Sequence, residues 1–177
     1  MNPIRVLVIT ALVAGCQKPA TTAPSAEAPG MVAVEWAGVV RGKLVAVAAG
    51  TWCQADSLLE ISAIRGDSGF GIALIEPDSV RPGQHPVVAP SVPVPWRPMA
   101  LAALRWVTDT AVKGFEANSG NVVITAVVNR EVSGTINVRL KQTDTNDTVR
   151  LTGRFTKVPW TSAVGSCGRA NRNRATP

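Results

Sequence analysis

The chain has 177 residues, with 18 Lys and Arg against 12 Asp and Glu and a formal net charge of +6. Arg5 and three arginines in the last ten residues carry much of that excess. The rest of the chain is only mildly basic, which argues against a nucleic-acid binder. No segment approaches the roughly 20 uninterrupted apolar residues that a transmembrane helix needs, so a membrane-spanning helix is excluded.

Residues 1–15 have the order of an export signal. A short positive start ends at Arg5, an apolar run follows at residues 6–13, and small residues precede Cys16. The run is too short to span a bilayer. We therefore expect residues 1–15 to be a signal peptide that directs the chain out of the cytoplasm.

The stretch Val13-Ala14-Gly15-Cys16 resembles the lipobox of bacterial lipoproteins, and this resemblance covers only the signal region. It implies that Cys16 becomes the lipidated N-terminus of a cell-envelope protein. In that family an aspartate after the cysteine favours the inner membrane. Here the residue is Gln17, so the resemblance favours the outer membrane. The alternative is an ordinary secretory signal followed by an unrelated cysteine.

The remaining chain divides into a tether, one domain and a tail. Residues 17–30 contain three prolines and no large apolar side chain, which is typical of a flexible, solvated linker, so residues 16–30 are expected to be a lipidated tether. Residues 31–167 have the length of a single domain. Residues 168–177 are polar, basic and unpatterned, as in disordered tails.

Two cysteines remain if Cys16 carries lipid. In an oxidising compartment Cys53 and Cys167 are expected to form a disulfide, and the alternatives are two inert thiols or an intermolecular bridge. These cysteines and the sole histidine, His85, do not make a zinc cage. We predict no metal site and no cofactor.

The clearest secondary-structure signal is a hairpin near the C-terminus. Residues 131–141 and 148–156 each alternate apolar and polar positions, and turn-forming residues separate them. The inward positions are Val132, Gly134, Ile136, Val138 and Leu140 in the first strand and Val149, Leu151, Gly153 and Phe155 in the second.

Further strands are expected at residues 39–47, 58–64 and 70–75. Residues 121–128 are apolar at nearly every position, so this strand is either covered on both faces or abuts a partner. The proline-rich residues 77–98 read as a long connection with short edge pieces. Residues 99–106 are compatible with helix or strand, and we favour strand.

Seven to nine short strands separated by segments rich in Gly and Pro indicate an all-β fold, either an antiparallel sandwich or a small barrel.

The sequence singles out no catalytic residue. The segment Gly66-Asp67-Ser68-Gly69 is explained by a hairpin turn, and no upstream histidine supports a serine nucleophile. The carboxylates available for glycoside hydrolysis are scattered, and no pair stands out among Asp56, Glu60, Asp109 and Glu116.

Five tryptophans and no tyrosine are present. We take Trp96 and Trp160 as candidate aromatic contacts for a sugar or a protein partner. The alternative is that the indoles plug the ends of the core. Trp52, beside Cys53, is expected to pack on the disulfide.

A basic face is predicted on the final hairpin, where alternation directs Arg139, Lys141, Arg150 and Arg154 to one side. A symmetric turn places Arg139 opposite Arg150, and like charges across a strand pair are mildly destabilising. Such a cost suggests an anionic partner, although a solvated face kept soluble by its charge is the simpler alternative.

These features favour a non-catalytic binding or structural module of the cell envelope. Its lipid would anchor it to the membrane, and its domain would dock on a protein or an anionic envelope component. A small-ligand or carbohydrate binder is the alternative, and a hydrolase is the third hypothesis.

Overall fold

The computed structural model describes residues 28–90, 97–165 and 167, and within these residues the fold is all-β, as predicted. The nine strands are β1 Met31–Gly38, β2 Gly42–Cys53, β3 Leu58–Arg65, β4 Ser68–Ile75, β5 Gly83–Pro86, β6 Met99–Val107, β7 Val112–Val128, β8 Glu131–Gln142 and β9 Thr148–Ala163. One 3-10 turn, Gln54–Asp56, joins β2 to β3. In this part of the chain no helix is long and apolar enough to cross a membrane.

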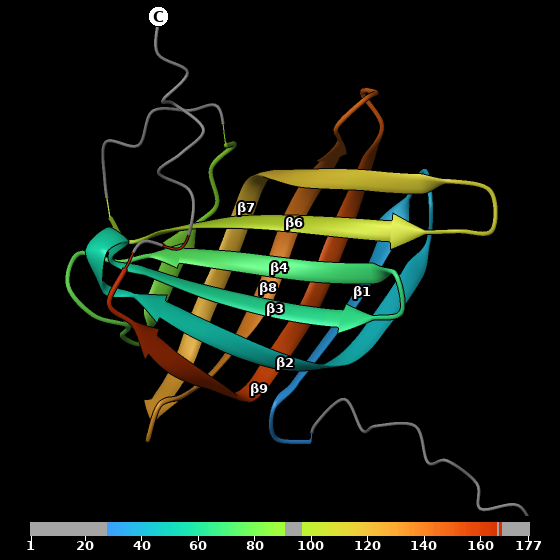
Figure 1. The fold of residues 1–177 in the computed structure, drawn as a ribbon. Helices are drawn as coiled ribbons and strands as arrows, with labels where there is room; N and C mark the ends of the chain where they lie inside the picture. Colours follow the sequence, from blue (N-terminus) through green and yellow to red (C-terminus); the bar gives the residue numbers. More distant parts are fainter. Residues whose placement is uncertain (1–27, 91–96, 166, 168–177) are drawn as a thin grey trace, which may run out of the picture.

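Eight of the strands form a closed antiparallel barrel (Figure 1). Each of β1, β2, β3, β4, β6, β7, β8 and β9 pairs with the next, and β9 pairs back with β1. The short β5 adds to β7 beyond the point where β6 ends. Of the two predicted architectures, the molecule adopts the barrel, which leaves few unpaired strand edges.

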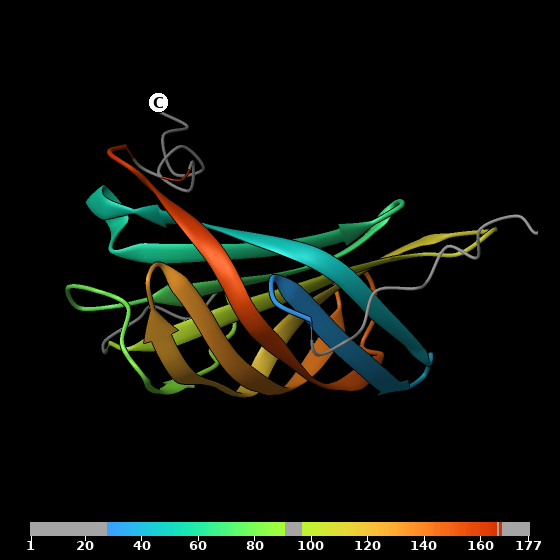
Figure 2. The same ribbon diagram turned by 90° about the horizontal axis from the view of Figure 1, so that it is seen from below.

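The long strand β9 changes partner along its length (Figure 2). Its first half pairs with β1, and its last residues, Trp160 to Ala163, run parallel to Gly50–Cys53 of β2. Lys157, between the two halves, has a φ of 46°. The change of partner brings the end of β9 beside Cys53, which allows the C-terminal cysteine to reach its partner.

Because apolar and polar residues alternate along the strands, apolar side chains fill the interior of the barrel. The inward residues of the β8–β9 hairpin are those predicted, and they join buried side chains from the other six barrel strands, including Val34, Leu59, Phe70, Leu104 and Phe115. An eight-stranded barrel has an interior about wide enough for side chains to fill. The core is therefore the lumen itself.

The two ends of the lumen are closed differently. At one end the rings of Trp36 and Trp106 meet edge to face, with their centroids 4.8 Å apart. The Trp36 indole lies over Gly42, where a Cβ would collide with it. At the other end the connection between β4 and β6 carries two polar side chains, Glu76 and His85, into the buried space.

The predicted strands are present, but the strand expected at residues 121–128 is only the second part of β7, which begins at Val112. Two further differences concern β1 and β2. Residues 39–41 form a turn, so the strand expected at 39–47 begins at Gly42, because a tight hairpin between Gly38 and Gly42 outweighs the β-branched Val39 and Val40. No strand is predicted for Met31–Gly38, which is nevertheless β1 and directs Val32, Val34 and Trp36 inward.

The ambiguous segments are also settled. Residues 99–106 are strand, as favoured, and in the described part of the proline-rich connection, residues 77–90 and 97–98, the only strand is the edge strand β5. β7 has partners on both edges, but its outer face is not covered, because Thr125 and Val128 are exposed.

Candidate anion-binding face

The four basic residues predicted on the final hairpin share its outer face. Arg139, Lys141, Arg150 and Arg154 are all exposed, and Arg139 lies directly opposite Arg150, as expected from a symmetric turn. Lys141 faces Thr148, and Arg154 faces Thr135. The period-2 alternation of the two strands accounts for this arrangement.

Barrel closure adds a second hairpin to this surface. β1 lies against β9, with Ala37 opposite Arg150 and Ala33 opposite Arg154. A hollow of about 570 Å³ lies beside Arg150, and Ala37, Arg41 and Lys43 also line it.

A second hollow, of about 490 Å³, continues along the same wall and is lined by Lys43 and Arg154. We call the whole surface the basic face, and it comprises Arg41, Lys43, Arg139, Lys141, Arg150 and Arg154.

Carboxylates lie opposite two cations of the basic face. Glu35, the only carboxylate among the described residues that line the two hollows, lies opposite Lys43 in the β1–β2 pair, and Glu116 of β7 lies opposite Lys141. The Arg150 Nε donates a hydrogen bond to Asn137 Oδ1 at 3.3 Å, which orients the guanidinium along the sheet. The six cations outnumber these two carboxylates, so this wall attracts anions.

Arg41 and Lys43 belong to the site although the sequence did not indicate them. Their outward orientation follows from β2, but their proximity to Arg150 depends on the pairing of β1 with β9. No local pattern specifies that long-range pairing.

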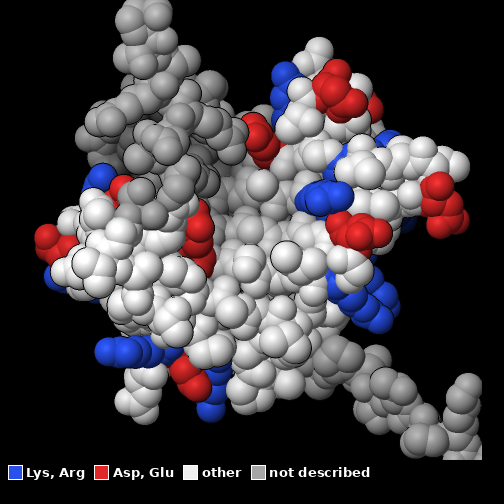
Figure 3. All heavy atoms as spheres, in the orientation of Figure 1, with Lys and Arg blue, Asp and Glu red and all other residues white. Residues whose placement is uncertain are grey.

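The opposite wall carries a different hollow. It measures about 420 Å³, its floor is made by small residues of β3, β4 and β6, and Glu60 and Glu116 line it. Figure 3 shows this wall as an uncharged depression with acidic side chains beside it. Because β4 and β6 separate the strands of the two glutamates, three strand spacings lie between them, or roughly 14 Å along the sheet.

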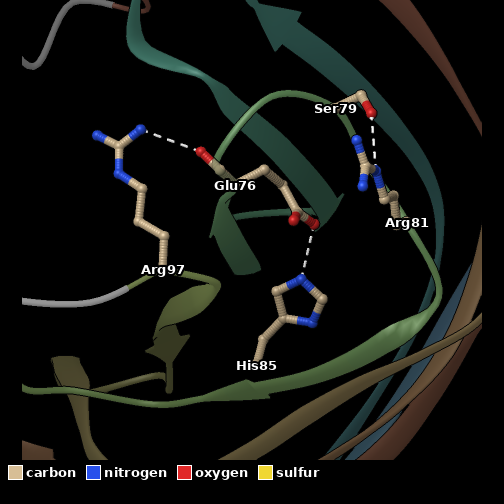
Figure 4. A network of polar contacts seen from close by, with 5 residues as sticks. All are labelled: Glu76, Ser79, Arg81, His85 and Arg97. Carbon is tan, nitrogen blue, oxygen red and sulfur yellow. Dashed lines mark hydrogen bonds and ion pairs between the residues drawn. The ribbon is translucent and has the colours of Figure 1, made fainter.

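A buried ionisable pair lies between β4 and β5 (Figure 4). The Nε2 of His85 and the Oε1 of Glu76 are 2.7 Å apart, and the side chains are only 1% and 3% exposed. Arg97 donates from Nη1 to the main-chain oxygen of Glu76 at 3.0 Å. These contacts fasten the β4–β6 connection over the end of the lumen.

The sequence contained a signal for this pair. Phe70, Ile72 and Leu74 point inward, so Glu76 occupies the next inward position, and His85 and Val87 are both buried. Two ionisable groups therefore do converge, but at a buried position and not on the wall of a hollow. Within the described residues no group of three His, Cys, Asp or Glu side chains is arranged to hold a metal ion.

The predicted disulfide between Cys53 and Cys167 is present, with Cα atoms 5.6 Å apart. It packs on the outside of the barrel, and the Cys167 N–H donates to Asp56 Oδ2 at 3.0 Å. Trp52 does not pack on it as expected. Successive residues of a strand point to opposite faces, so Trp52 joins the core inside while Cys53 faces outward.

Of the remaining predicted site residues, Trp160, Trp96 and Cys16, the structure describes only Trp160. Trp160 is half-buried and packs against the core, with its indole nitrogen buried and lacking a hydrogen-bond partner among the described atoms. Trp96 and Cys16 lie outside the described residues. Together with the Trp36–Trp106 contact, these positions favour the interpretation that the described indoles plug the ends of the core.

No family model matches the chain, and neither a curated protein nor a solved structure was found to match it.

Proposed function

We propose that the protein is a lipid-tethered, non-catalytic binding module of the bacterial cell envelope that holds an anionic component on its basic face. The observation that carries this proposal is the direct pairing of Arg139 with Arg150 on a wall that also presents Arg41 and Lys43. Like charges opposite each other cost stability. A binding function gives a reason for keeping them together.

The filled lumen supports binding on the outside of the barrel. Buried side chains from all eight barrel strands occupy the interior, and the hollows described above lie on the outer walls. A carbohydrate or small-ligand site in the mouth of the barrel would need accessible indoles. Among the four described indoles, Trp36 and Trp52 are buried and Trp106 and Trp160 are half-buried, so these four give this alternative little support.

A hydrolase also has little support in the described residues. Glu76 and His85 are enclosed, and Glu60 and Glu116 project from strands that β4 and β6 separate. The lipobox-like segment ending at Cys16 supports an envelope location, with the outer membrane favoured by Gln17. Residues 17–30 then separate the barrel from the lipid.

A polyanion-binding experiment tests the proposal. The probe is heparin on a column, and the protein is the full chain in an unacylated Cys16→Ser form with its disulfide intact. Arg139→Ser/Arg150→Ser removes two charges from the basic face. The matched control, Arg65→Ser/Arg105→Ser, removes two exposed charges carried by β3 and β6.

We expect the control to elute with the parent protein and the basic-face variant to elute at clearly lower salt, because polyanion binding depends on local charge. Equal shifts for both variants would show that retention follows net charge alone, and the proposed site would be wrong.

A further inference from the structure

We infer that the basic face rests on the anionic phospholipid headgroups of the membrane that anchors the chain, so that the barrel lies with β8, β9 and β1 against the lipid. This inference rests on the proposed function, and it names the anionic component as the lipid surface itself.

The chain enters the barrel on the wall that carries the basic face. The N–H of Gly30 donates to the carbonyl oxygens of Thr156 and Lys157, at 2.7 and 3.1 Å, and β1 begins at the next residue. β1 lies between β9 and β2, the strands that supply Arg150, Arg154 and Lys43. The segment that leads from Cys16 therefore joins this wall at the end of β1 nearest Arg154, whereas Arg150 and Lys43 lie toward the other end of β1.

The tether is long enough for the face to lie flat. Residues 17–29 span at most about 43 to 47 Å when fully extended, whereas the eight residues of β1 extend over about 26 Å. A lipid on Cys16 thus leaves the orientation of the barrel open. The charges of the basic face are what would select one orientation.

The chemistry of the face suits a lipid surface better than a protein partner. Protein interfaces have a desolvated core rich in aromatic side chains. The centre of the basic face instead presents Ala33, Ala37 and Thr152 between cations, and Trp36, which lines one hollow, is only 3% exposed.

Val39, an apolar residue that is 53% exposed, lies in the β1–β2 turn two residues before Arg41. Cations on three strands and in the β1–β2 turn, with an apolar residue at the margin, match a layer of many headgroups.

This orientation turns the floor of the third hollow away from the lipid. In the closed ring of eight strands, β9 is four positions from β4, and β1 is four positions from β6. The small residues of β4 and β6 that form the floor of this hollow therefore lie on the far side of the barrel when the basic face rests on lipid. Glu116, at the β7 border of the hollow, lies opposite Lys141 of the basic face.

Vesicle sedimentation tests the lipid contact. The full chain in its Cys16→Ser form is mixed with vesicles of phosphatidylglycerol and phosphatidylcholine, or of phosphatidylcholine alone. We expect binding only to the anionic vesicles, and weaker binding as salt rises. Arg139→Ser/Arg150→Ser should weaken it about 10- to 30-fold. Arg65→Ser/Arg105→Ser should change it less than about twofold.

A second measurement tests the orientation with the acylated protein. A fluorophore is attached to Thr135→Cys on the basic-face wall or to Ser62→Cys on the opposite wall, both at exposed positions. Spin-labelled headgroups in anionic vesicles should quench the probe at 135 more strongly than the probe at 62. Equal quenching, or stronger quenching at 62, would overturn the inferred orientation.

The outcomes separate this inference from the proposed function. Heparin retention that depends on Arg139 and Arg150, without binding to anionic vesicles, overturns the lipid contact and leaves an anionic envelope component other than lipid as the ligand. Loss of face-dependent binding to both probes overturns both proposals.

Discussion

Arg139 of β8 and Arg150 of β9 are direct cross-strand neighbours on the outer wall of the barrel, and both side chains are exposed. Arg139→Thr should therefore raise the free energy of unfolding by about 0.2 to 1 kcal/mol at low salt, because a like-charge pair is removed. Urea titration at two salt concentrations measures the gain, which should shrink as salt screens the charges.

Arg105→Thr is the matched control for that prediction. Arg105 is also exposed on the outside of the barrel, but its cross-strand neighbours are Gly69 and Gly114, so no repulsion is relieved. A stabilisation of equal size in this variant would trace the effect to strand propensity and not to charge.

The Glu76–His85 pair should be essential for stability. His85→Leu leaves the Glu76 carboxylate buried without its partner, and breaking a buried pair in this way costs about 3 to 5 kcal/mol. Chemical denaturation gives the loss. Asp78→Asn breaks an exposed pair with Arg81, 3.7 Å apart and 64% and 76% exposed, and should cost less than about 1 kcal/mol. Similar losses in the two variants would contradict the role assigned to burial.

The Cys53–Cys167 disulfide should contribute strongly to stability because it closes a loop of 114 residues. In the chain-entropy model such a loop is worth up to about 4 to 5 kcal/mol. Thermal unfolding of a Cys53→Ser/Cys167→Ser variant, compared with the oxidised protein, measures the contribution. An unchanged melting temperature would show that the barrel holds its C-terminal end without the bridge.

Gly134 of β8 should not tolerate a side chain. A Cβ at this inward position would overlap the ring of Phe155 and the carbonyl oxygen of Val123, so Gly134→Ala should cost about 1 to 3 kcal/mol.

Gly71→Ala is its control, because a Cβ there meets only the Ile61 oxygen at 3.8 Å. Denaturant midpoints should fall for the first variant and stay nearly unchanged for the second. Equal effects would mean that backbone entropy, and not the close approach of Phe155, requires the glycine.

Cys16 should carry the lipid. In a bacterial host, labelling with a palmitate analogue should mark the parent protein and leave Cys16→Ser unmarked, and only the parent should stay with the membrane fraction after a salt wash. Label retained by Cys16→Ser would contradict the assignment of the lipidated residue.

The alternation of single strands could be predicted from the sequence because its cause is local. A strand turns successive side chains to opposite faces, so residues 131–141 and 148–156 specified both their inward residues and the outward position of the four basic side chains. The edge position of β5 followed from proline content, whereas residues 99–106, which lie in β6, are compatible with helix or strand, and only their strand-rich surroundings favour strand. The pairing of Cys53 with Cys167 followed from their number and the expected compartment.

Only the tertiary structure decided how the strands close and what that closure brings together. β1 pairs with β9 across nearly the whole domain, and this long-range pairing selects a barrel over a sandwich and adds Arg41 and Lys43 to the wall of Arg150. The same closure encloses Glu76 with His85. Period-2 patterns state which face of a strand is buried, but they do not state which strand lies beside it, because many pairings bury the same faces equally well.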